Sequence, residues 1–392
     1  MTKSFDEKSA LALVMQLMAI RGPSCEETAV ADAIVSILAE MGIERSTVQF
    51  DTAHRRTPRP GAIGNLIVKL PGDNKRPRIM LSAHMDTVPV CLGAQPKKVG
   101  GKIISADKST GLGADDRAGI AAVLVGLREG IRSGVTLPPL TLCFFVQEEI
   151  GLQGSRNLSA AKLGKVAMAY NFDGGSPAKL TIGATGGERL KIVLHGQTAH
   201  AGLAPEAGAS AIHAAGLAIA RLQKAGWLGA VRKGKLAGTS NIGVIHGGVA
   251  TNVVADRVEI DAEARSHDGP FRDRIASEIE QAFVEEAAKI VSRSGNAVRA
   301  EVSRRVDYES FRLADDSPVV EVAKSAVKAC GLEPITAVSN GGVDANWLVK
   351  HGIPTVTLGC GQRDVHTQNE SLDIADYLAA CRIAKALIEH AA

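Results

Sequence analysis

Aromatic residues are scarce in this chain of 392 residues, because tryptophan, tyrosine and phenylalanine together make up only 3% of it. That scarcity argues against a surface on which nucleic acid bases would stack. An excess of charge of one sign is lacking too, since 45 lysines and arginines face 42 aspartates and glutamates and leave a formal net charge of +3. This near balance gives no reason to expect a nucleic acid partner.

Paired cysteines and long apolar runs are also missing. The six cysteines are scattered, with no Cys-x-x-Cys pair among them; they are Cys25, Cys91, Cys143, Cys330, Cys360 and Cys381. This spacing indicates neither a zinc ribbon nor a disulfide framework, so we expect a reduced, cytoplasmic protein. No segment reaches about 18 unbroken apolar residues, and the first residues lack the apolar core and cleavage site of a signal peptide. We therefore expect no membrane partner.

Short apolar runs alternate with helical patterns in the first part of the chain. The runs are residues 65–70, 79–83, 140–146 and 166–171. Residues 115–131 form a helical pattern, and residues 24–41 predict a further helix that opens with Ser24 and Glu27 as a capping box and stops at Gly42. Apolar runs that alternate with helices predict an α/β fold, with a parallel or mixed sheet covered on both faces.

The pattern changes near residue 182. Alternating strands and amphipathic helices follow in the order β-α-β-β-α-β, which is the order of a ferredoxin-like module. A helix and a buried strand of the first style then return in residues 317–331 and 352–359. We therefore expect residues 1–182 and 308–392 to form one larger domain, with residues 183–307 as a smaller inserted domain.

Acidic and histidine side chains follow four of the predicted strands, at the point where each strand ends. In chain order they are His84 and Asp86, Glu148 and Glu149, Asp173, and His366. Asp115 and Asp116 open the helix that follows the first of these strands. Any one of them could be a helix cap or an ordinary buried polar residue. Because sites in open α/β sheets form outside the carboxyl ends of the strands, the whole set predicts a functional site at that edge.

The composition of this set indicates a metal. Two histidines and several carboxylates, with no cysteine among them, suit borderline to hard divalent ions such as zinc, cobalt or manganese. The set also offers more ligands than one tetrahedral ion needs. Two ions about 3.5–4 Å apart, sharing a bridging carboxylate, would use the surplus.

Five motifs then carry a resemblance to a known family. They are SAHMDTVP, GADDRAG, EEIGLQGS, DGG and DVHT, in this order along the chain. These motifs are similar to those of the M20 metallopeptidases, and the similarity extends to TAHAGLAPEAGASAI and GGVATNVVAD in the inserted part. The resemblance implies a two-zinc catalytic domain with a central mixed sheet. It also implies that the inserted domain is a ferredoxin-like lid that forms a homodimer.

The resemblance assigns the metal ligands position by position. His84 and Asp173 would hold one ion, Glu149 and His366 the other, and Asp115 would bridge the two. The ions would be two Zn²⁺, with Co²⁺ or Mn²⁺ as alternatives.

Further roles are implied around the ligands. Asp86 would orient His84, and Glu148 would be the general base that takes a proton from the attacking water and passes it to the leaving amine. The peptide bond between Asp115 and Asp116 would be cis.

Three residues of the inserted domain are implied as well. His200 would reach across the dimer and stabilise the developing oxyanion, while Asn252 and Arg265 would contact the substrate. Plainer interpretations exist for two of them, because Asn252 suits a turn and Arg265 suits an exposed strand position.

The residue at position 173 bears on which bond is cleaved. The family branch that acts on acyl-amino acids or C-terminal residues usually has Glu where this chain has Asp173, so the chain resembles the aminopeptidase branch that contains tripeptidase T. One departure is that the sequence from residue 200 is His-Ala-Gly where tripeptidase T has His-Pro-Gly. We therefore expect an aminopeptidase that removes the N-terminal residue of short peptides.

Three alternatives remain open at this point. The same site could serve an N-acyl-amino-acid deacylase or a carboxypeptidase, which would not require a free α-amino group. The chain could be a binding or scaffold protein that has kept the fold and lost the reaction. A cysteine hydrolase built on Cys360 and His366 is a third alternative, but it leaves the carboxylates unexplained.

Overall fold

The computed structural model describes residues 5–390, in which the chain leaves a first unit after Ala184 and returns to it at Arg312. The second unit is Thr185–Phe311. The boundaries predicted from the sequence, after residues 182 and 307, lie two and four residues earlier. Strand β14 (Phe311–Arg312) lies where the chain passes from the second unit back to the first.

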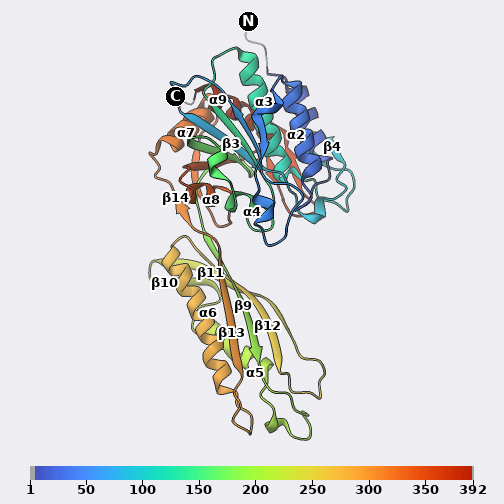
Figure 1. The fold of residues 1–392 in the computed structure, drawn as a ribbon, viewed down its shortest axis with the longest axis vertical. Helices are drawn as coiled ribbons and strands as arrows, with labels where there is room; N and C mark the ends of the chain where they lie inside the picture. Colours follow the sequence, from blue (N-terminus) through green and yellow to red (C-terminus); the bar gives the residue numbers. More distant parts are fainter. Residues whose placement is uncertain (1–4, 391–392) are drawn as a thin grey trace. The chain divides into compact units, whose positions relative to one another are not determined.

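A mixed sheet forms the centre of the first unit (Figure 1). Its strands are β1 (Val48–Phe50), β2 (Leu66–Leu70), β3 (Arg78–His84), β6 (Leu140–Phe145), β7 (Val166–Phe172), β8 (Lys179–Ala184), β15 (Ile335–Ser339) and β16 (Thr355–Leu358). Together with β14 they lie in the order β1-β2-β6-β3-β7-β16-β8-β14, and β15 also pairs with β8. The four central strands β6, β3, β7 and β16 are parallel. Strand β2 is antiparallel to β6, and β8 is antiparallel to β16 but parallel to β15. The predicted α/β fold with a central mixed sheet is confirmed.

Both faces of this sheet are buried. The helices of this unit are α1 (Glu7–Met18), α2 (Thr28–Glu40), α3 (Ala114–Ser133), α4 (Gln153–Arg156), α7 (Pro318–Ala329), α8 (Ala345–Lys350) and α9 (Ile374–His390). Ile79 and Leu81 of β3 face a large apolar cluster that includes residues of α1, α2, α3, α7 and α9, whereas Met80 faces a smaller cluster with Leu348 of α8. A strand that is buried on both faces has a continuous run of apolar residues, which is why these strands could be predicted from the sequence.

A small antiparallel sheet completes the first unit. Its strands are β4 (Pro96–Val99), β5 (Lys102–Ser105), β17 (Gln362–Arg363) and β18 (Ser371–Asp373), in the order β17-β18-β5-β4. Through β17 and β18, this sheet fixes the ends of the loop that carries His366.

The second unit is an antiparallel sheet with two helices. Its elements are β9 (Gly186–His195), α5 (Ala211–Lys224), β10 (Gly229–Lys233), β11 (Leu236–Gly247), β12 (Arg257–Ser266), α6 (Gly269–Lys289) and β13 (Arg299–Tyr308), and its sheet order is β10-β11-β12-β9-β13. Ile192, Ile260 and Phe271 belong to the apolar cluster that joins sheet and helices. The expected β-α-β-β-α-β order is present. Strand β10 was not predicted, because it is a short and mostly exposed edge strand without a clear alternation.

One predicted helix start is wrong. Helix α2 begins at Thr28 rather than at Ser24, and the expected capping box does not form. The hydroxyl of Ser24 donates instead to Asp86 Oδ2 at 2.6 Å, and the Glu27 carboxylate accepts from the amides of Cys25 and Gln147. Both side chains therefore serve long-range contacts with the loops after β3 and β6.

In the described part of the chain, residues 5–390, no helix combines the length and the apolar character that crossing a membrane requires. All six cysteines carry free thiols.

Candidate metal centre

The carboxyl ends of three neighbouring strands bring the predicted residues to one edge of the sheet. His84 is the last residue of β3, which lies between β6 and β7 and runs parallel to both. Glu148 and Glu149 lie in the turn after β6, and Asp173 directly follows β7. Parallel strands end at the same edge, and the site is therefore positioned by the topology of the sheet.

Two groups of side chains meet at this edge with the spacing of metal ligands. One consists of His84, Asp115 and Asp173, and the other of Asp115, Glu149 and His366. In each group, one ligand atom from each residue lies within 4.8 Å of the others. Asp115 belongs to both groups.

The two oxygens of Asp115 face different imidazoles. Oδ1 lies 3.0 Å from Nε2 of His84, and Oδ2 lies 3.2 Å from Nε2 of His366. The same nitrogen of His366 lies 2.9 Å from Glu149 Oε2. A carboxylate placed in this way between two groups can be shared by two cations. The peptide bond between Asp115 and Asp116 is cis, as predicted.

The orientation of His84 differs in part from the prediction. Its Nδ1 lies 3.0 Å from the main-chain carbonyl oxygen of Asp86, and the Asp86 carboxylate is further away at 3.5 Å. That carboxylate accepts instead from the amides of Glu148 and Glu149, at 2.9 and 3.2 Å, and from the Ser24 hydroxyl. With Nδ1–H donating to the carbonyl, Nε2 is left as the nitrogen that faces the site.

Burial and crowding shift the protonation of these groups. Burial, together with the charge of Asp115, raises the pKa of Asp173 to about 8, and burial also raises the pKa of Glu149 and Glu148. Burial acts in the same direction on Asp115, but hydrogen bonds from His366 and His84 outweigh it and hold its pKa well below the usual range. The site thus concentrates carboxylates whose negative charge is costly without a cation nearby. The donor set and its spacing fit divalent metal ions such as zinc.

Two buried carboxylates around the ligands had no predicted role. Asp116 was noted at the start of its helix, and it accepts from the amide of His84 at 3.1 Å and from Gln362 Nε2 at 2.9 Å. Glu370 was missed altogether because it lies in a polar stretch with no pattern around it. Its function becomes visible only in the fold, where it holds the loop before Asp115.

Glu370 binds three backbone amides of that loop. Its Oε2 accepts from the amides of Leu112 and Gly113, both at 2.8 Å, and its Oε1 accepts from the amide of Asp115 at 3.0 Å. The residue that belongs to both ligand groups is therefore held through its main chain as well as its side chain.

The three predicted residues of the inserted domain lie in the second unit. His200 is exposed, and its Nδ1 accepts from the amides of Gly202 and Leu203 at 3.2 and 3.1 Å, which leaves Nε2 as the protonated nitrogen. The carbonyl of Asn252, in the loop between β11 and β12, accepts from the amide of Ala201. The Arg265 guanidinium is bound by the carboxylate of Glu263 through two hydrogen bonds of 3.0 Å.

The geometry does not favour a cysteine nucleophile. Cys360 is fully buried, and burial raises the pKa of its thiol well above the usual value. Its sulfur lies near the carbonyl oxygen of Gly174 and near Asp116 Oδ1, at 3.6 and 3.7 Å. A nucleophilic cysteine needs a lowered pKa or an adjacent base, and this environment has the opposite effect.

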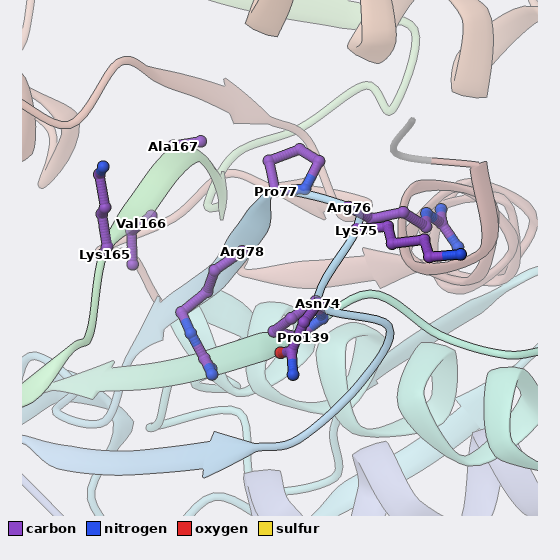
Figure 2. A pocket seen from close by; sticks show the side chains of 9 residues that line it. All are labelled: Asn74, Lys75, Arg76, Pro77, Arg78, Pro139, Lys165, Val166 and Ala167. Carbon is purple, nitrogen blue, oxygen red and sulfur yellow. The ribbon is translucent and has the colours of Figure 1, made fainter.

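A separate cavity of about 540 Å³ lies at the other end of the same strands (Figure 2). Its lining includes Arg78 at the start of β3, Pro139 just before β6 and Val166 at the start of β7. The lining contains no carboxylate and no histidine, and Figure 2 shows that the side chains of Lys165 and Arg76 point in different directions. This cavity therefore lacks the groups for metal chemistry.

Comparison with known proteins agrees with this geometry. The model of peptidase family M20/M25/M40 matches residues 80–390. The chain is similar to the uncharacterized protein YqjE of Bacillus subtilis (strain 168), with 33% identity over 388 residues that cover 99% of each chain. It is also similar to the crystal structure of aminopeptidase PepT from Bacillus cereus ATCC 10987, with a TM-score of 0.86 and 32% identity over 99% of both chains. A tripeptidase from Staphylococcus aureus subsp. aureus Mu50 gives a TM-score of 0.89 and 31% identity, again over 99% of both chains.

Proposed function

Because the chain belongs to peptidase family M20/M25/M40, we propose that it is a metal-dependent aminopeptidase that removes the N-terminal residue of short peptides. The observation that carries the proposal is the position of Asp115, whose two oxygens face His84 in one ligand group and His366 in the other. The similarity to an aminopeptidase and to a tripeptidase supports the choice of substrate.

We assign the ligands of two zinc ions to these groups. His84 and Asp173 would hold one ion, Glu149 and His366 the other, and Asp115 would bind both. Cobalt or manganese would suit the same donors. When bound, such ions supply Lewis acidity to the scissile carbonyl and make a nearby water more acidic.

The remaining chemistry belongs to side chains of this protein. Glu148 is in neither ligand group, and burial raises its pKa well above the usual value, so it can hold a proton. As general base it would take a proton from the attacking water and pass it to the leaving amine. His200, with its proton on Nε2, would donate to the developing oxyanion.

Asn252 and Arg265 remain proposed substrate contacts. Asn252 is exposed and can offer its side-chain amide. Arg265 would have to exchange Glu263 for a substrate carboxylate, which it could bind with the same bidentate geometry.

The direct test is hydrolysis of a tripeptide with a free N-terminus and of the same peptide with an acetylated N-terminus, each by zinc-loaded protein. We expect cleavage of the free peptide only, with release of its N-terminal amino acid. This activity should be lost when a chelator removes the metal. Amino acid analysis of the products measures both. Preference for the acetylated peptide would instead support the deacylase or carboxypeptidase alternative and would make Asp173 a misleading marker.

We also propose that the protein is a homodimer through its second unit. Strand β10 pairs with Leu236–Ser240 of β11 only, so from Asn241 to Gly247 that edge of β11 has no strand partner within residues 5–390. Val244 and Ile245 on this stretch are 40% and 49% exposed. An open edge with exposed β-branched residues can pair with the same edge of a second copy, in a symmetric interface.

Replacing Ile245 by lysine is expected to convert the dimer to a monomer of 40.9 kDa, because a charge would be placed on the proposed contact. Sedimentation velocity would measure the mass. The matched control is Leu236→Lys, since Leu236 lies on the same strand, is 37% exposed, and is already paired with β10. A dimer that persists in Ile245→Lys would place the interface elsewhere.

We further propose a cytoplasmic location. The six free cysteines support it, because unpaired thiols are typical of reducing compartments.

A further inference from the structure

The turn that carries Glu148 and Glu149 is held in place through hydrogen bonds from its backbone amides. Four successive amides, those of residues 146–149, donate to buried side-chain oxygens. Val146 donates to Asn65 Oδ1 at 3.1 Å, and Gln147 donates to Glu27 Oε1 at 3.1 Å. The next two amides donate to Asp86. No strand of residues 5–390 pairs with this turn. The carbonyl oxygens of Gln147 and Glu148 accept from the amides of Gln153, Gly151 and Leu152 on its far side, so the near side of the turn is held by these four side-chain acceptors.

Glu27 is the acceptor that comes from furthest away in the chain. It is fully buried just before helix α2, and 120 positions separate it from Gln147. Its Oε1 also accepts from the amide of Cys25 at 2.9 Å. Both Cys25 and Gln147 have positive φ, at 79° and 53°, a backbone conformation that residues other than glycine rarely adopt. One carboxylate oxygen thus joins two unusual backbone positions.

We propose that Glu27 is a positioning residue of the peptidase site, which acts by holding the amide of Gln147 so that Glu148 and Glu149 project toward the metal ligands. This inference rests on the proposed function for its catalytic consequence. The physical reason is that Glu148 would have to reach the attacking water while Glu149, at the adjacent position, would hold a metal ion. A turn that shifts by about 1 Å is expected to cost on the order of 100-fold in rate.

Only one oxygen of Glu27 makes these bonds, since Oε2 has no hydrogen-bond partner. A glutamine can therefore keep the acceptor and place its amide nitrogen where Oε2 lies. Burial, together with the charge of Asp86, also raises the pKa of Glu27 to about 7, so a neutral glutamine is a close substitute for this carboxyl near neutral pH. The negative charge of Asp86 also acts on the buried Arg117 nearby, whose guanidinium donates to the carbonyl oxygens of Ile20 and Gly22, so Arg117 does not depend on the charge of residue 27 alone.

The experiment compares Glu27→Gln with Glu27→Met, two side chains of similar length that differ in the acceptor. We expect Glu27→Gln to keep kcat within about threefold of the parent protein, and Glu27→Met to lower kcat by on the order of 100-fold with KM little changed. The matched control is Glu26→Met, because Glu26 is the adjacent residue of the same type, is exposed, and pairs with Arg21 on the surface.

Hydrogen–deuterium exchange of the substrate-free proteins gives a second measurement. Glu27→Met should speed exchange in the peptide that covers residues 146–149 and leave the central strands unchanged. Glu27→Gln should leave both unchanged. This measurement decides on the positioning role even if the parent protein cleaves no peptide, an outcome that would overturn the proposed function alone.

Three outcomes would overturn the positioning role. The first is a Glu27→Met protein with the kcat of the parent. The second is a Glu27→Gln protein that loses as much activity as Glu27→Met, since the oxygen acceptor would then not be what matters. The third is exchange that rises throughout the chain in Glu27→Met, which would indicate a general loss of stability.

Discussion

Replacing Glu148 by glutamine is expected to lower kcat by about 100- to 10,000-fold, the range typical of a lost general base. Glutamine has the same shape but cannot accept a proton at neutral pH. The change should leave the metal sites intact, because Glu148 is in neither ligand group and its amide stays bound to Asp86. Steady-state kinetics on a tripeptide would measure kcat, and elemental analysis of the same samples would measure the metal.

A suitable control for this variant is Glu26→Gln, an exposed glutamate far along the chain from the turn. It should retain full activity. Normal turnover in Glu148→Gln, with metal bound, would remove the assignment of the base and leave the ligand groups untouched. Loss of metal along with activity would instead make Glu148 a ligand.

Replacing Asp115 by alanine is expected to have the largest effect on metal binding. Asp115 is the residue that both ligand groups share, so its loss removes a ligand from each proposed ion at once. We expect the variant to retain neither ion after dialysis and to lose roughly 1,000-fold or more of its activity, because nothing would then activate the carbonyl and the water.

Asp173→Ala provides the comparison for that experiment, since Asp173 belongs to one group only. It should lose one ion and keep the other. The two variants together distinguish a shared carboxylate from two independent sites. Retention of both ions by Asp115→Ala would show that Asp115 does not bridge.

The sequence shows which side chains gather at this edge of the central sheet, because a buried strand is apolar and the residues that gather here are polar. The interior of β3 must be apolar on both faces, so a histidine at its end stands out, and the same holds for Asp173 after β7. Parallel neighbours then bring such residues together without further information. The grouping of His84, at the end of β3, with Asp173, after β7, arises in this way.

Contacts that depend on the path of a loop were not predictable. Ser24 and Glu27 have the spacing of a capping box, and nothing local shows that Asp86 and Gln147 will compete for them. Nor does the sequence show which part of Asp86 orients His84, because that depends on where the amides of the later turn come to lie. Strand β10 was missed for a different reason, since an exposed edge strand carries little pattern.

The bonds from Glu370 to the loop before Asp115 bear on when the protein becomes active during synthesis. A nascent chain that has not reached residue 370 can already contain β3, β6 and β7, yet the amides of Leu112, Gly113 and Asp115 lack their acceptor. Before residue 366 is made, the second ligand group is also incomplete. We therefore expect the unfinished chain to be inactive on the ribosome, where the N-termini of other new chains are close by. It should begin to cleave peptides only after β18 has paired with β5.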